Sequence, residues 1–120
     1  MPVVQYLVEQ GADKDKAHEN GRTPLYVAAQ KGHLPVVQYL VAQGADKEKA
    51  TANGCSPLFV AVHEGCLPVV QYLVEQGADK DKASDTGITP LQVAQFKGHA
   101  EVAAYLLAAG AGDDSDDDDN

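Results

Sequence analysis

The stretch PVVQYLVEQGADKDKA at residues 2–17 decides the fold, because it recurs without change at residues 68–83. Another copy at residues 35–50 reads PVVQYLVAQGADKEKA, so successive copies are 33 residues apart. A fixed period of roughly 20–50 residues is typical of stacked-repeat proteins, in which each unit buries one face against its neighbours. The repeat therefore predicts a stack of similar units rather than a single irregular core.

A second block with the same spacing predicts a short helix in each unit. It reads GRTPLYVAA, GCSPLFVAV and GITPLQVAQ, beginning at Gly21, Gly54 and Gly87. In each block a threonine or serine precedes a proline, which predicts an N-cap followed by proline in the first helical turn. A glycine suited to a left-handed C-cap follows each helix, at Gly32, Gly65 and Gly98.

The block that recurs at residues 2–17, 35–50 and 68–83 predicts a second helix and a loop in each unit. Apolar side chains recur at helical spacing and make one broad stripe, namely Val36, Val37, Leu40 and Val41. Gly44 ends this helix, and the polar stretch at residues 45–54 lacks apolar periodicity, so we expect an extended projecting turn. Each unit is thus predicted to be helix, tight turn, helix and projecting turn.

These residues resemble the ankyrin repeat: the 33-residue period, TPLYVAA and TPLQVA, then GHL, V-V-x-Y-L and GAD. The resemblance implies an all-α solenoid of stacked helix-turn-helix units with projecting β-hairpin-like turns. It covers residues 1–112, with a half repeat at 1–20 and repeats at 21–53, 54–86 and 87–112. Residues 113–120 form an acidic tail that we expect to be disordered.

The sequence departs from the family pattern where the family has a histidine after T-P-L. Tyr26, Phe59 and Gln92 stand at this position. The hydrogen bonding between repeats that is usually assigned to that histidine therefore cannot be assumed.

The net charge of −9 excludes some classes of partner. Six aspartates lie within residues 113–119, and the remaining 12 acidic and nine basic side chains leave only −3. A general nucleic-acid binder or a protein for anionic membranes needs a basic face, so neither is expected. No signal peptide or membrane-spanning run is found, and two cysteines are too few for a disulfide scaffold, so we expect reduced thiols and a cytoplasmic or otherwise intracellular protein.

Catalytic, metal and cofactor sites find little support. His33, Cys66 and His99 share one helix-start position, where capping or packing is favoured over metal binding, because neighbouring repeats are about 8–10 Å apart. A Cys–His nucleophile pair would need an orienting third group and a pocket, which the sequence does not show. No phosphate-binding loop or calcium loop fits the chain, so no cofactor, metal or enzymatic activity is expected.

The variable positions indicate a surface for a protein partner. The second-helix block is nearly constant, whereas the loop tips and first helices change between copies. The resemblance implies that such positions contact partners on a concave surface. They are Glu19, Asn20, Arg22, Tyr26, Gln30, Lys31, Ala52, Asn53, Cys55, Phe59, His63, Glu64, Asp85, Thr86, Ile88, Gln92, Phe96 and Lys97.

Within this surface Tyr26, Phe59 and Phe96 are the expected aromatic anchors, with Arg22 and Lys31 as polar contacts. Tyr26 and Phe59 have an alternative role, which is to fill the gap between repeats left by the absent histidine.

The second hypothesis for function is self-assembly. Met1 aligns with the start of a second helix, and the last helix carries alanines in place of polar residues, so neither end is expected to have a polar coat. A structural or self-assembling module, either a fragment or a consensus-like designed array, would then contact copies of itself through its uncapped ends as a homo-oligomer.

Overall fold

The computed structural model describes residues 21–110. The half repeat predicted for residues 1–20 and the tail predicted for residues 113–120 lie outside the described residues. The described part contains six helices in chain order: α2 (Pro24–Gln30), α3 (Leu34–Ala42), α4 (Pro57–His63), α5 (Leu67–Glu75), α6 (Pro90–Lys97) and α7 (Ala100–Ala108).

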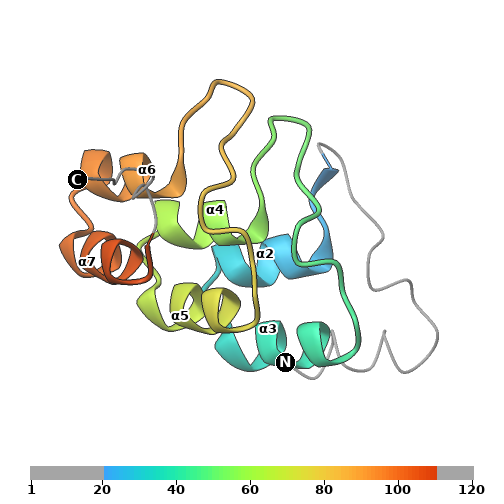
Figure 1. Cartoon of the computed structure of the whole chain (residues 1–120). Coiled ribbons are helices and arrows are strands. Elements are labelled where there is room, and N and C mark those ends of the chain that lie inside the picture. The colour runs from blue at the N-terminus through green and yellow to red at the C-terminus, as the bar shows by residue number, and fades with distance from the viewer. Residues whose placement is uncertain (1–20, 111–120) are drawn as a thin grey trace.

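The helices form two layers (Figure 1). The first helices of the units, α2, α4 and α6, lie side by side in one layer, and α3, α5 and α7 lie side by side in the other. Each first helix also packs against the second helix that follows it. Two long loops, between α3 and α4 and between α5 and α6, project from the stack in the same direction. The predicted helical repeat fold is thereby confirmed for the described residues.

Side-chain hydroxyls begin the three first helices, as the sequence predicts. Thr23 Oγ1 accepts from the Tyr26 amide at 3.1 Å, and Ser56 Oγ accepts from the Phe59 amide at 3.1 Å. At the third helix the Gln92 amide donates to Thr89, and the Gln92 side-chain oxygen accepts from the Thr89 amide at 2.9 Å, which completes a capping box. The proline in each first turn loses no helical hydrogen bond.

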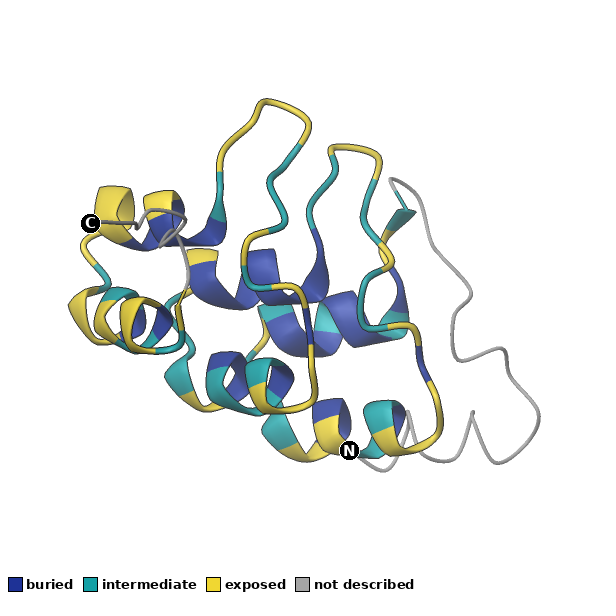
Figure 2. Ribbon diagram, viewed as in Figure 1, coloured by how far each residue is buried: buried dark blue, intermediate teal, exposed yellow. Residues whose placement is uncertain are grey.

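The core runs through the whole stack between and within the two layers (Figure 2). Leu25 and Leu58 from the first-helix layer are each 1% exposed, and Val36, Val37 and Leu40 of α3 are at most 1% exposed. Val36, Val37 and Leu40 belong to the apolar stripe that the sequence predicts for the second helix. Because each helix is short, this burial between units rather than helix propensity stabilises the array.

Each projecting loop is closed at its tip by backbone hydrogen bonds. The Thr51 amide donates to the Cys55 carbonyl at 2.9 Å, and the Ser84 amide donates to the Ile88 carbonyl at 2.9 Å. The two tips are also joined, because the Asp85 amide donates to the Asn53 carbonyl at 3.0 Å. The tips therefore form a connected edge, which matches the hairpin-like turns that the resemblance implies.

A second connection lies nearer the bases of the same loops. Glu48 accepts from the Asp79 amide through its carboxylate at 2.8 Å, and its carbonyl accepts from Lys82 Nζ at 2.7 Å. The mixed charges of these loops thus contribute hydrogen bonds between repeats. Together the two connections hold neighbouring loops in a defined spacing.

Gly54 provides a test of the joined tips. Its φ of +80° lies in the left-handed region, and a Cβ added there would approach the Asp85 amide nitrogen to 2.7 Å. Gly87 has a φ of +84°, but a Cβ there meets nothing within 4 Å. We expect Gly87→Ala to lower the free energy of unfolding by about 1 kcal/mol from backbone strain alone.

Gly54→Ala should cost about 2–3 kcal/mol, because it adds a clash with the Asn53–Asp85 connection to that strain. Urea unfolding of the two variants measures the difference. Equal losses for both would contradict the close packing of the two loop tips.

Candidate functional site

A concave hollow lies between the two projecting loops and the neighbouring sides of α4 and α6. Its volume is about 830 Å³, which is within the range of protein ligand sites. Three kinds of segment contribute to it: the two loop tips, α4 from Phe59 to its last residue His63, and one face of α6. The lining residues are Asn53, Cys55, Phe59, His63, Ser84, Asp85, Thr86, Ile88, Gln92, Val93, Gln95, Phe96 and Lys97.

Most of this lining coincides with the variable positions found in the sequence. The predicted residues that the structure brings together here are Asn53, Cys55, Phe59, His63, Asp85, Thr86, Ile88, Gln92, Phe96 and Lys97. Six other predicted residues lie outside the lining, namely Arg22, Tyr26, Gln30, Lys31, Ala52 and Glu64. Glu19 and Asn20 lie outside the described residues.

Sequence reasoning missed three lining residues. Gln95 replaces Ala29 and Val62 of the earlier repeats, so its change to a polar residue was a usable signal. Ser84 lies beside Thr86 at a loop tip, and their hydroxyl oxygens are 2.9 Å apart. Valine stands at the position of Val93 in every copy, so variation between repeats could not identify this residue.

Tyr26 and Phe59 take the packing role that was their alternative. Tyr26 is 9% exposed and Phe59 is 7% exposed, and both belong to the continuous core. Phe59 also reaches the hollow, where its remaining surface forms part of the floor. Burial is the main cause that raises the pKa of the Tyr26 phenol, with Cys55 adding to it and Arg22 opposing it.

In the third repeat, positions that face the next unit become polar. Gln92 is exposed where Tyr26 and Phe59 are buried, and Gln95 is exposed where Ala29 and Val62 are both 0% exposed. The first-helix layer therefore ends in polar side chains at α6. The missing polar coat was predicted for the last helix, α7, where Leu107 is 51% exposed.

In the same repeat, positions that face outward become apolar. Phe96 is 89% exposed where the earlier copies have Gln30 and His63, and Ile88 is 43% exposed where they have Arg22 and Cys55. Two large apolar side chains at the edge of one hollow are unusual on a soluble surface unless something covers them. This exchange of polarity distinguishes the third repeat from its otherwise similar neighbours.

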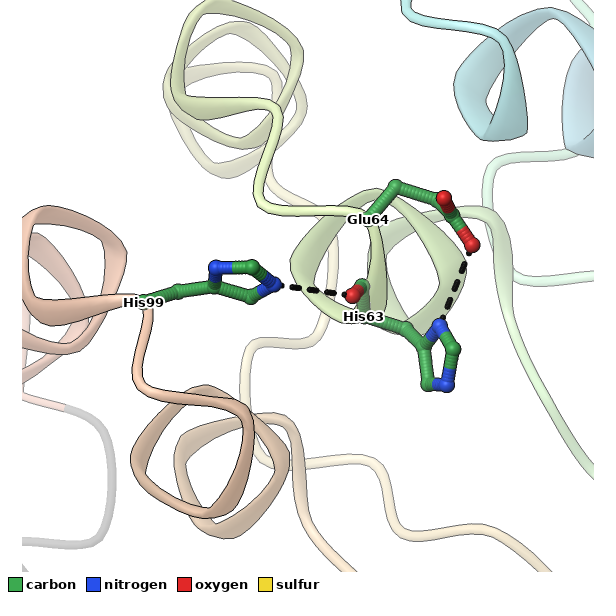
Figure 3. A network of polar contacts seen from close by, with 3 residues as sticks. All are labelled: His63, Glu64 and His99. Atoms are coloured by element: carbon green, nitrogen blue, oxygen red, sulfur yellow. Dashed lines mark hydrogen bonds and ion pairs between the residues drawn. The ribbon is translucent and has the colours of Figure 1, made fainter.

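Polar contacts link His63, which lines the hollow at the end of α4, with Glu64 and His99 (Figure 3). His99 Nε2 lies 3.0 Å from the His63 carbonyl oxygen, and His63 Nδ1 lies 3.1 Å from Glu64 Oε2. The His99 ring also packs closely against Gly65, since a Cβ added to that glycine would come within 2.7 Å of the ring. These contacts join the end of α4 to the start of α7.

Two of the three helix-start residues pack against a glycine of the preceding unit. None of His33, Cys66 and His99 makes a side-chain capping hydrogen bond. Cys66 faces Gly32 of the preceding unit, as His99 faces Gly65. Among residues 21–110, no group of three or more His, Cys, Asp or Glu side chains is placed to hold a metal ion.

A nucleophilic role for Cys55 is disfavoured by its position. Cys55 precedes the start of α4 and His63 ends that helix, so the helical rise of about 1.5 Å per residue separates them by roughly 10 Å. Burial raises the pKa of the Cys55 thiol, a hydrogen bond with Thr51 partly opposes this, and the nearby charge of Asp85 adds a smaller increase. A raised pKa disfavours the thiolate, which is the form that acts as a nucleophile.

Comparison with known families agrees with the geometry. A family described as ankyrin repeats (3 copies) matches residues 1–84 and 49–119. The chain therefore belongs to the ankyrin-repeat family, whose members are generally protein-interaction modules and are typically non-catalytic. A search of curated proteins found no match. Within the described residues, the helices are too short to cross a membrane.

The two phenylalanines of the hollow should differ sharply in their effect on stability. Phe59→Ala removes a buried ring and should lower the free energy of unfolding by about 3–5 kcal/mol. Phe96→Ala removes an exposed ring and should change it by less than about 0.5 kcal/mol. Urea unfolding measures both, and a large loss for Phe96→Ala would show that its ring is packed.

The thiol of Cys55 offers a second measurement. In a Cys66→Ser background, the rate of iodoacetamide alkylation should rise with pH around a midpoint above that of a cysteine in a short peptide, because the raised pKa delays thiolate formation. Asp85→Asn removes a negative charge and should move this midpoint to lower pH. A midpoint at or below that of the peptide would contradict the burial of Cys55.

Proposed function

We propose that this chain is a non-catalytic binding module that holds a protein partner on its concave surface, with the hollow between the two projecting loops as the centre of contact. The observation that carries the proposal is the exposure of Phe96, at 89%, on the edge of that hollow. Exposed aromatic side chains at a concave site are frequent centres of binding energy.

The surroundings of Phe96 support the same role. Ile88 and the accessible edge of Phe59 extend the apolar area across the hollow, while Asn53 and Thr86 supply polar groups at its rim. The loop tips are joined by the hydrogen bond from Asp85 to Asn53, so less conformational freedom is lost when a partner binds. A rigid apolar centre with a polar rim is the usual anatomy of a protein interface.

The remaining variable positions extend this surface toward the first described repeat. Arg22 and Lys31 are exposed there and are proposed as peripheral contacts. Cys55 and Cys66 are both free thiols, which supports the proposal of an intracellular location.

The binding proposal is tested with the chain as bait for affinity capture from its source organism. Proteins retained by the wild type should be lost with Phe96→Ser and retained with Gln30→Ser, which alters the equivalent position of the first described repeat outside the hollow. For a captured protein, Phe96→Ser should raise the Kd at least about tenfold. Isothermal titration measures this, and binding that is unchanged by both Phe96→Ser and Arg22→Ala would exclude the concave surface.

Self-association is a second candidate function, and it is favoured by an observation on α2. Pro24 and Val27 are only half-buried, whereas Pro57 and Val60 at the equivalent positions of α4 are buried. Pro24 and Val27 thus have less cover than their counterparts in α4. At the other end of the same layer, the exposed Gln92 and Gln95 offer no matching apolar face.

Light scattering after gel filtration separates the two candidates. A self-associating array should show a mass that rises with concentration, and Val27→Ser should reduce it because the substitution makes the α2 face polar. A constant monomer mass across concentrations would exclude self-association and leave the binding proposal standing.

A further inference from the structure

The positions of the charged residues in the hollow indicate which charges a partner needs. Among the lining residues, Asp85 and Lys97 are the ones that carry a formal charge when histidine is neutral. Asp85 lies at the tip of the second projecting loop, and Lys97 is the last residue of α6. The hollow therefore has a negative end at the loop tip and a positive end at the helix terminus.

Both charges are available to a partner. Asp85 and Lys97 are exposed, and within residues 21–110 neither side chain forms an ion pair. Asp85 uses its backbone amide, not its carboxylate, to join the loop tips. The carboxylate and the ammonium group can therefore form new ion pairs without breaking one.

The same charge order is absent from the preceding repeat. Ala52 stands at the position of Asp85, and Glu64 stands at the position of Lys97. The first repeat has the same charge order in Glu19 and Lys31, but Arg22 and Gln30 stand there at the positions of Ile88 and Phe96. Three features of this site, the apolar centre, the negative tip and the positive helix end, occur together only here among the described repeats.

The separation of the two charges sets a length. From Pro90 to Lys97 the helix rises by roughly 10 Å, and the five residues from Pro90 to Asp85 span at most about 17 Å, less where the hydrogen bond from the Ser84 amide to the Ile88 carbonyl folds the loop tip. The two charges are therefore at most about 27 Å apart, which is no more than about eight residues of an extended chain.

We infer that the hollow takes a short extended segment of a protein partner, in which a bulky apolar residue lies between a basic residue and an acidic residue no more than about eight positions apart. The basic residue meets Asp85 at the loop tip, the acidic residue meets Lys97, and the apolar side chain lies against Ile88 and Phe96. This inference rests on the proposed function and specifies the partner chemistry of that same site.

A library of random 12-residue peptides displayed on phage is the probe for this inference. Peptides are selected on the full chain and counter-selected on Phe96→Ser, so that only binders of the hollow are kept. The expected consensus has one bulky apolar position flanked by a Lys or Arg on one side and an Asp or Glu on the other. Either chain direction fits the inference, because the order is defined relative to the hollow.

Charge reversal then tests which end binds which charge. With a selected peptide, Asp85→Lys should raise the Kd about fivefold, and changing the basic residue of the peptide to Glu should restore most of the loss. Lys97→Glu should act in the same way on the acidic residue. Lys31→Glu, at the equivalent helix position outside the hollow, and Glu75→Lys, at the end of α5, are matched controls and should leave the Kd within about twofold.

The outcomes separate the inference from the proposed function. Phe96-dependent peptides without the charge order, or a Kd that changes by less than twofold in both Asp85→Lys and Lys97→Glu, overturn the inference and leave the proposed function in place. Failure to select any Phe96-dependent peptide overturns the inference, whereas the proposed function is overturned when protein capture is unchanged by Phe96→Ser and Arg22→Ala. A chain that self-associates through Phe96 also overturns the inference, because the occupant of the hollow would then be a second copy.

Discussion

The stacking of first helices on one another is the constraint on which the rest of the structure depends. Each helix pair is too short and too broadly apolar to be stable alone, so its cover must come from the neighbouring unit. Leu25 and Leu58 in the first layer and Val36 and Leu40 in the second are buried for this reason. Because every unit must present the same apolar surface to its neighbour, the sequence repeats with a fixed period, which is 33 residues here.

The same stacking places the loop tips beside one another and so creates the concave surface. Because α4 and α6 are in contact, the loops that precede them emerge one repeat apart, close enough for the Asp85 amide to reach the Asn53 carbonyl. Their bases are joined in the same way through Glu48. The hollow is thus a consequence of how the scaffold is spaced, and its rigidity comes from hydrogen bonds that no single unit could form.

Much of the fold and of the candidate site could be predicted from residue patterns. The caps at Thr23 and Ser56 were evident because a hydroxyl before a proline has few other local uses. Variation between copies located Phe96 and Ile88, since it shows where the scaffold does not dictate the residue. It did not locate Val93, which is constant yet lines the hollow. It also did not separate Tyr26, which fills an interface between repeats, from Phe96, which is exposed.

The sequence by itself determined the repeat, the helix pairs, their caps and the family, because these depend on local chemistry recurring at a fixed spacing. Only the tertiary structure decided which variable residues share one hollow and which are buried. Phe59 and Gln92 occupy the same repeat position, yet one is 7% exposed and the other lies on the surface. The physical reason is that burial depends on whether a neighbouring unit covers the position, and repeat spacing alone does not contain that information.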